Sequence, residues 1–357
     1  MSKILLSLTN DLNNIITDSI KKAKLDGLIS YDDIPKFLVE IPQDRSNGDL
    51  ATNAALVCAK TFKMSPMKIA SIITSYFNLD NTLIDHFKIA NPGFINFYFK
   101  PEFYSKILKD IENLKDNYGK SDFGNNKRIM VEFVSANPTG PMHMGNARGG
   151  ALGDCLASVL ETAGYDVYRE FYINDAGNQI EKFGLSLDIR YLQIFKGEEN
   201  VILPEDSYHG EDIKELAMLF ADKYSDSYLD KDECTRRKAL VDFALPRNIE
   251  KMKKDMKKYR IEYDRWFNES LLHNDGEVQE TINILKQKGL TYELDGALWY
   301  KASSFGAEKD EVLIRKNGTP TYFAADIAYH RNKFAIRKFD RCIDIWGADH
   351  HGHVLRM

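Results

Sequence analysis

A histidine at the predicted start of a helix is the first residue of this chain that could do chemistry. His143 follows a turn rich in proline and glycine, and apolar residues then recur at helical spacing, from Leu152 to a stop at Gly164. Asn146 and Arg148 add hydrogen-bond donors on the first turn. A lone histidine usually caps a helix or lies on the surface. Because a helix N-terminus attracts anions, however, this context predicts a site for a nucleotide phosphate.

Two carboxylates in apolar surroundings are candidates for binding a cation. Glu132 interrupts the apolar segment 129–134, where a charge is costly unless it is paired. Asp326 follows Tyr322 by four residues in a predicted helix, so the two side chains share one face. Each carboxylate either forms a structural salt bridge or holds a cationic substrate. An acidic pocket with a tyrosine hydroxyl would suit a guanidinium or ammonium group.

Three histidines near the end of the chain form a further group, His350, His351 and His353. They either bind a metal ion or belong to a nucleotide-contacting turn after the apolar strand 342–346. We favour the turn, because two adjacent histidines cannot easily point at one ion and no cysteine accompanies them. The sequence therefore predicts no metal site.

These residues must be positioned by alternating strands and helices. The strand 129–134 leads into the helix that begins near His143, and the alternating strand 165–173 leads into a second helix. Strand–helix–strand–helix with short connections implies a parallel sheet, whose ligands bind beyond the carboxyl ends of its strands. The predicted fold is α/β, a Rossmann-type parallel-sheet catalytic domain preceded by a small α+β N-terminal domain.

The predicted domain boundaries follow shifts in composition. Residues 1–117 are expected to form the α+β domain and residues 118–127, rich in Gly, Asn and charge, a linker. Residues 128–357 are expected to form the catalytic domain, with an inserted, mainly helical segment at about 190–312. A basic run at 251–260 in that segment is either a solvated helix face, which we favour, or a contact with RNA phosphates.

The composition is that of an ordinary globular protein. Of 357 residues, 43% are hydrophobic and 28% charged, and no apolar run approaches the length of a membrane span. The four cysteines lie far apart, which argues against a zinc knuckle or a disulfide framework and fits a reducing cytosol. A net charge of −5 gives nucleic-acid binding no support unless basic residues cluster. We therefore expect a cytoplasmic protein that does not enter a membrane.

The segment around His143 resembles a known signature. VEFVSANPTGPMHMGNARGGALGD, residues 131–154, is similar to the first signature of class I aminoacyl-tRNA synthetases in its arginyl-tRNA synthetase form. His143-Met144-Gly145-Asn146 stands where that class has His-x-Gly-His. Five further stretches also resemble the family: GDLATNAA, NPGFINFYF, YREFYINDAGNQI, YDRWFNES, and TYFAADIAYHRNKF followed by WGADHHGHV.

The resemblance implies an arginine–tRNA ligase. Such enzymes join the arginine carboxylate to the α-phosphate of ATP and then transfer the arginyl group to tRNA, so catalysis is positioning plus stabilisation of charge on phosphate oxygens. The implied partners are arginine, ATP and tRNA(Arg). Mg²⁺ would accompany ATP through its phosphates, no tightly bound cofactor is expected, and a monomer is expected. The N-terminal domain would contact the outer corner of the tRNA.

The resemblance also implies roles for single residues. The signature motif runs through Ala136, Asn137, Pro138, Thr139, Gly140, Pro141, Met142, His143, Met144, Gly145 and Asn146. His143 and Asn146 would be catalytic, and ATP would contact His143, Gly145, Asn146, Gly347, Asp349 and His350. Arginine would contact Glu132, Ser135, Asn137, Glu269, Tyr322 and Asp326.

The chain departs from the family pattern at two points. Asn146 replaces the second histidine, and an amide can donate a hydrogen bond but cannot carry charge. The second signature, a Lys-Met-Ser-Lys-type loop, and the helical anticodon-binding domain are both absent; Lys63-Met64-Ser65-Pro66 lies too early, and we interpret it as a helix cap. We therefore expect a fragment with impaired catalysis. The alternatives are a non-catalytic tRNA- or arginine-binding module and, less favoured, a small nucleotidyltransferase.

Overall fold

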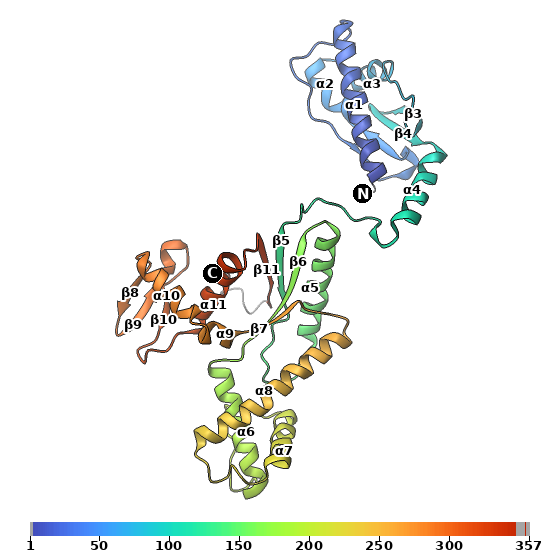
Figure 1. The fold of residues 1–357 in the computed structure, drawn as a ribbon. Helices are drawn as coiled ribbons and strands as arrows, with labels where there is room; N and C mark the ends of the chain where they lie inside the picture. Colours follow the sequence, from blue (N-terminus) through green and yellow to red (C-terminus); the bar gives the residue numbers. More distant parts are fainter. Residues whose placement is uncertain (1–2, 348–353, 355–357) are drawn as a thin grey trace. The chain divides into compact units, whose positions relative to one another are not determined.

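The structure, a computed structural model, describes residues 3–347 and residue 354, and the chain divides into two compact units, residues 1–120 and 121–357. In the first unit three helices pack against a four-stranded antiparallel sheet of order β1-β2-β4-β3 (Figure 1). Its elements are α1 (Lys3–Leu25), β1 (Val39–Glu40), β2 (Leu50–Thr52), α2 (Ala54–Phe62), α3 (Pro66–Thr74), β3 (Ile84–Ala90), β4 (Phe94–Phe99) and α4 (Pro101–Leu114). Ser65 is the N-cap residue of α3 and Pro66 its first residue, as predicted from the sequence.

A parallel sheet organises the second unit. It is formed by β5 (Arg128–Phe133), β6 (Asp166–Ile173), β7 (Arg265–Asn268) and β11 (Arg341–Ile345). The strand order is β11-β5-β6-β7, and every pair is parallel. The chain moves from β5 through β6 to β7 and then returns to the other side of β5. The order therefore reverses between β5 and β11, which is where open α/β sheets bind ligands. The predicted α/β fold is confirmed.

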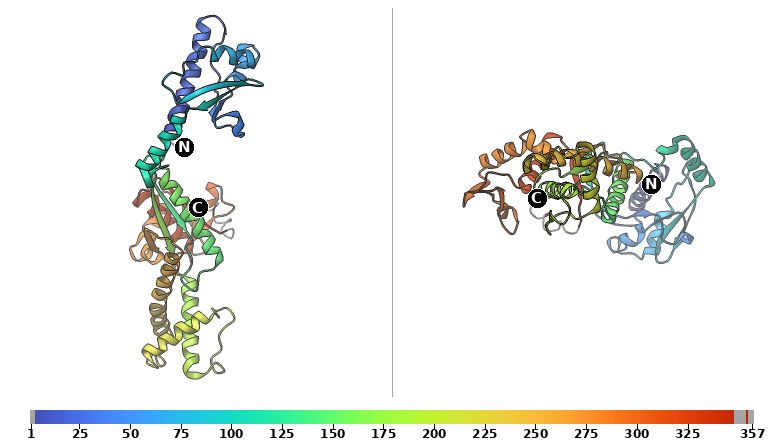
Figure 2. Two further views of the ribbon diagram at one scale, coloured as in Figure 1. Left: turned by 90° about the vertical axis from the view of Figure 1, so that its right-hand side faces the viewer. Right: turned by 90° about the horizontal axis from the view of Figure 1, so that it is seen from below.

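The helices of this unit lie beside the sheet and beyond one of its ends (Figure 1). They are α5 (Met144–Thr162), α6 (Asn178–Lys196), α7 (Glu211–Tyr224), α8 (Glu233–Lys258), α9 (Glu269–Asn274), α10 (Glu277–Gln287) and α11 (Tyr322–Arg331). Both Figure 1 and Figure 2 place α6, α7 and α8 at the end of the sheet where β5 and β6 finish. Within residues 3–347, no helix is long and apolar enough to cross a membrane.

A small antiparallel sheet follows α10. Its order is β10-β9-β8, with β8 (Thr291–Leu294), β9 (Ala297–Tyr300) and β10 (Glu311–Ile314). The segment predicted as a mainly helical insertion, at about 190–312, thus contains most of this sheet and also β7 of the parallel sheet.

Glycines bring α5 close to β5. A Cβ on Gly153 would lie 2.1 Å from Cγ of Phe133, so only glycine allows this approach. The apolar residues that predict the helix do not all form its buried face, since Leu152 is 60% exposed and Val159 65% exposed. The helix packs instead through its small residues, which hydrophobic spacing cannot reveal.

Candidate active site

A pocket of about 1160 Å³ opens at the point where the strand order reverses. Its walls come from β5, the loop that follows it, the first turns of α5, the start of α6, α11, and the end of β11. The predicted site residues that line it are Glu132, Ser135, Ala136, Asn137, Thr139, Gly140, Pro141, His143, Gly145, Asn146, Asp326 and Gly347. All of these lie in the second unit.

The N-terminus of α5 forms one side of this pocket. His143 is its N-cap residue, and its Nδ1 accepts a hydrogen bond from the backbone N–H of Gly145 at 3.1 Å. In return, Oδ1 of Asn146 accepts from the backbone N–H of His143 at 2.9 Å, which completes a capping box. Because Nδ1 accepts, the ring hydrogen is on Nε2 and remains available to donate. A Cβ on Gly145 would lie 2.9 Å from Cε1 of His143. A larger residue at position 145 would therefore clash with the imidazole ring in this orientation.

The loop between β5 and α5 is held in an unusual conformation. Val134 and Ser135 have φ values of 70° and 42°, in the left-handed region that non-glycine residues seldom adopt. Nδ2 of Asn248 on α8 donates to the carbonyl of Pro138 at 2.9 Å. Nδ2 of Asn137 donates to Oε1 of Gln179 on α6 at 2.9 Å. Two neighbouring helices therefore hold the loop that carries the signature residues.

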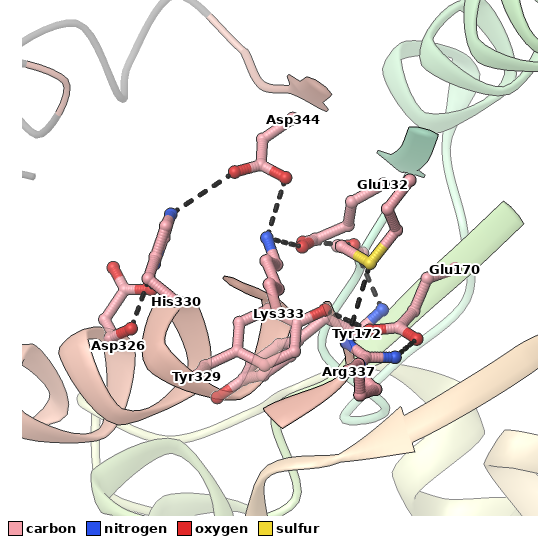
Figure 3. A network of polar contacts seen from close by, with 11 residues as sticks. Glu132, Glu170, Tyr172, Asp326, Tyr329, His330, Lys333, Arg337 and Asp344 are labelled. Carbon is pink, nitrogen blue, oxygen red and sulfur yellow. Dashed lines mark hydrogen bonds and ion pairs between the residues drawn. The ribbon is translucent and has the colours of Figure 1, made fainter. Parts of the chain in front are cut away.

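A buried ammonium group links β5 to β11 (Figure 3). Nζ of Lys333 donates to Oε2 of Glu132 at 2.8 Å and to Oδ1 of Asp344 at 2.7 Å. Burial would lower the pKa of Lys333, but the two carboxylates outweigh it and hold the pKa above its usual range. Burial raises the pKa of Glu132, and the Lys333 ammonium group opposes that rise. Glu132 therefore has the salt-bridge partner that its apolar surroundings require.

His330 extends this network toward Asp326. Its Nδ1 lies 2.9 Å from the Asp326 carbonyl oxygen and 3.4 Å from Oδ1, and its Nε2 lies 3.4 Å from Oδ2 of Asp344. Burial would lower the pKa of His330, but these carboxylates raise it to about 9. The ring is therefore a cation at neutral pH, held between Asp326 of the pocket wall and Asp344 of β11.

Glu269 does not line the pocket itself but lies behind Tyr172, which does. It is buried at the start of α9, and its Oε2 accepts from the hydroxyl of Tyr172, which does line the pocket, at 2.8 Å. Burial raises the pKa of Glu269 to about 7, because its charged form loses hydration. A cation entering beside Tyr172 would favour the ionised carboxylate.

Some predicted site residues are not among the described residues that line the pocket: Pro138, Met142 and Met144 of the signature, Glu269 and Tyr322. Tyr322 is 60% exposed, and the tyrosines that do line the pocket are Tyr172, Tyr208 and Tyr329. Asp349 and His350 lie outside the described residues, as do His351 and His353. Over residues 3–347 no group of three or more His, Cys, Asp or Glu side chains is arranged to hold a metal ion.

Sequence reasoning missed Lys333 and His330. His330 lies in α11, and Lys333 lies in the π-helical turn Asn332–Ile336 that continues it. The available signal was Glu132, since a charge in an apolar strand needs a partner, but nothing in the sequence identifies that partner as Lys333.

Comparison with known proteins assigns the chain to a family. Residues 108–357 match the family "tRNA synthetases class I (R), catalytic domain", and residues 10–99 match "Arginyl tRNA synthetase N terminal domain". The chain belongs to the class I arginyl-tRNA synthetases. The pocket is thus in the part of the chain that matches the catalytic domain of arginyl-tRNA synthetases, and the part that matches their N-terminal domain lies within the antiparallel first unit.

Individual arginyl-tRNA synthetases resemble the chain over its full length. The arginine–tRNA ligases of Acetivibrio thermocellus and Caldanaerobacter subterraneus subsp. tengcongensis are 54% and 53% identical over 357 residues, which is 100% of this chain and 63% of each relative. The solved arginyl-tRNA synthetase of Plasmodium falciparum shares the fold, with a TM-score of 0.60 and 19% identity over 97% of this chain and 60% of that one. The chain therefore spans 63% of the length of the curated relatives it matches.

Proposed function

We propose that this pocket binds arginine and ATP side by side and that the chain takes part in arginine–tRNA ligation. The observation that carries the proposal is that one pocket combines a capped helix N-terminus with an acidic network. The helix end suits phosphates, and the acidic network suits a guanidinium group. The proposal agrees with the names of the relatives, which are arginine–tRNA ligases.

ATP would lie against the first turn of α5. The Nε2 hydrogen of His143 and the side-chain amide of Asn146 would face its phosphates, with Gly347 near the nucleotide. As the arginine carboxylate attacks the α-phosphate, negative charge grows on the phosphate oxygens, and fixed donors stabilise it without reorganising. The side-chain amide of Asn146 would donate without a charge of its own. Mg²⁺ would arrive with the ATP phosphates.

Arginine would lie against the acidic network. Asp326 lines the pocket and Glu269 lies behind Tyr172, so a planar guanidinium could meet both ends of an acidic wall. Ser135 and Asn137 would meet the amino acid's backbone groups. Tyr322 is expected here from the resemblance, but in our proposal Tyr172 supplies the phenol. The further partner would be tRNA(Arg), contacted by the first unit, and we expect a cytoplasmic monomer.

A second candidate is a binding module that holds arginine or tRNA without catalysis. It is favoured by one feature of the sequence: the chain carries the first phosphate-contacting signature of the family and no Lys-Met-Ser-Lys-type loop in residues 128–357. On this view the chain alone binds arginine or tRNA but forms no adenylate.

Substrate binding and adenylate formation, measured on the same preparation, separate the candidates. We expect calorimetry to detect both arginine and ATP, and arginine-dependent pyrophosphate exchange to be slow, with tRNA present. In His143→Ala, exchange should fall by about a hundredfold, as for loss of one preorganised donor, with arginine affinity unchanged. Exchange at the rate of a full-length relative would contradict the binding module, and absence of arginine binding would contradict both ligation and an arginine-binding module.

A further inference from the structure

Lys333 is the most deeply buried charged residue among those described around the pocket, with its side chain 1% exposed, and the proposed chemistry does not use it. We infer that Lys333 is a positioning residue for the amino-acid end of the pocket. The Lys333 ammonium group neutralises Glu132, and Glu132 in turn holds the Ser135 hydroxyl in place. Glu132 therefore shapes this end of the pocket but does not bind the guanidinium group of the substrate. The inference rests on the proposed function, because that substrate is arginine.

Two carboxylates would repel each other if Lys333 were absent. Glu132 on β5 and Asp344 on β11 are directly paired residues of adjacent parallel strands. Like charges at such positions destabilise a sheet. The ammonium group of Lys333 lies within 2.8 Å of Oε2 of Glu132 and within 2.7 Å of Oδ1 of Asp344, so one cation serves both strands at the point where the strand order reverses.

The other carboxylate oxygen of Glu132 is hydrogen-bonded to the loop between β5 and α5. Oε1 of Glu132 accepts from the Ser135 hydroxyl at 2.9 Å, and the same hydroxyl oxygen accepts from the backbone N–H of Tyr172 at 3.1 Å. Ser135 has a φ of 42° and follows Val134 with a φ of 70°, and such conformations persist only where the surroundings enforce them. Lys333, Glu132 and Ser135 thus form a relay that fixes the loop beside the proposed amino-acid position.

Glu132 is for the same reason an unsuitable anchor for a guanidinium group. Both of its oxygens already accept hydrogen bonds, one from an ammonium group and one from a hydroxyl group. A substrate cation would have to displace a lysine that two carboxylates hold and whose side chain is 1% exposed. Of the carboxylates assigned to arginine by resemblance, Glu132 therefore acts indirectly, and Asp326 and Glu269 are left to meet the cation.

A second buried ion pair provides a matched control. Arg337, four residues after Lys333, forms a bidentate pair with Glu170, which is fully buried on β6 and also accepts from the Tyr329 hydroxyl at 2.5 Å. Neither Arg337 nor Glu170 is among the described residues that line the pocket. Loss of this pair should cost stability, as loss of the Lys333 pair does, but should leave the substrate site intact.

The test is calorimetric titration of the full chain with arginine and, separately, with ATP. In Lys333→Met we expect arginine affinity to fall at least about tenfold and ATP affinity to stay within about threefold of the original chain. In Arg337→Met both affinities should stay within about threefold despite a lower melting temperature. The double variant Lys333→Met with Glu132→Gln keeps an oxygen for Ser135 and removes the unpaired charge. Its arginine affinity should return to within about threefold of the original chain.

Two results would overturn the inference while leaving the proposed function standing. One is arginine affinity in folded Lys333→Met equal to that of the original chain. The other is a folded double variant that binds ATP normally but arginine at least about tenfold more weakly, since Glu132 would then bind the cation directly. The double variant alone decides the matter if Lys333→Met does not fold. An original chain that binds no arginine would overturn the proposed function and this inference with it.

Discussion

Asn146 shows how one residue changes the chemistry available at a helix start. Its Oδ1 is committed to the backbone N–H of His143, and Nδ1 of His143 is committed to the backbone N–H of Gly145. What remains for an anion is the side-chain amide of Asn146 and the Nε2 hydrogen of His143. Both are donors that need no positive charge, which suits a site that binds phosphate and stabilises its added charge by position.

We expect the carboxylate of Asp326 to contribute directly to arginine affinity. Asp326→Asn removes a carboxylate from the pocket wall and leaves a desolvated guanidinium group without its charged partner. We expect arginine binding to weaken by about 2 kcal/mol or more while ATP binding is retained, as measured by calorimetry. Unchanged arginine affinity in the folded variant would remove Asp326 from the site.

Glu269 makes arginine affinity depend on pH. Its pKa, raised by burial to about 7, means that the carboxyl is largely neutral at pH ~6 and largely ionised at pH ~8. Because only the ionised form attracts a guanidinium group, affinity should rise by up to about tenfold over that interval. The variant Glu269→Gln should bind arginine more weakly and show no such rise. If this variant kept the same pH dependence, another group would be responsible.

At the scale of elements, local signals predicted the architecture but not the contacts of the site. The strand containing Glu132, the helix starting at His143 and the parallel sheet all follow from spacing, turns and caps, which are local. The partner of Glu132 could not be predicted, because Lys333 lies 201 residues away in sequence. Spacing suggested Tyr322 as the neighbour of Asp326 and did not point to the contact that Asp326 makes with His330 on the following turn. Both Tyr322 and His330 are four residues away, so spacing alone could not choose between them.

The contact between α5 and β5 supports a prediction about packing. Gly153→Ala would place a Cβ 2.1 Å from Cγ of Phe133, so the helix must move, and we expect a loss of about 1–3 kcal/mol in the free energy of unfolding. Gly149→Ala on the same helix is the control, because its Cβ would meet no atom within 4 Å. It should stabilise the helix by up to about 1 kcal/mol. Equal effects of the two changes in chemical denaturation would contradict this packing.

At the scale of the whole molecule, the second unit can be followed separately from the first. All three tryptophans, Trp266, Trp299 and Trp346, lie in residues 121–357, so their fluorescence reports on the unit that holds the pocket. Every described residue lining the pocket also lies in that unit. Substrate binding and unfolding can therefore be measured on the full chain without interference from the first unit's signal.

The raised pKa of His330 leads us to expect that the stability of the second unit depends on pH. Its pKa rises from 6.5 to about 9 on folding, so the folded unit binds this proton more tightly than the unfolded chain does. The resulting stabilisation is fully present below pH ~6.5 and is lost as the pH rises through about 9; it amounts to roughly 3 kcal/mol. Tryptophan-detected denaturation should show this loss in the original chain and not in His330→Gln. A parallel loss in both would assign it to other groups.

The most direct test of the central claim compares arginine with citrulline, its neutral isostere, in calorimetric titrations of the full chain. If the acidic wall of the pocket recognises a guanidinium group, arginine should bind at least about thirtyfold more tightly than citrulline, or about 2 kcal/mol. In Asp326→Asn that preference should shrink by most of this amount. Equal affinity for arginine and citrulline, or no binding of arginine, would contradict the account.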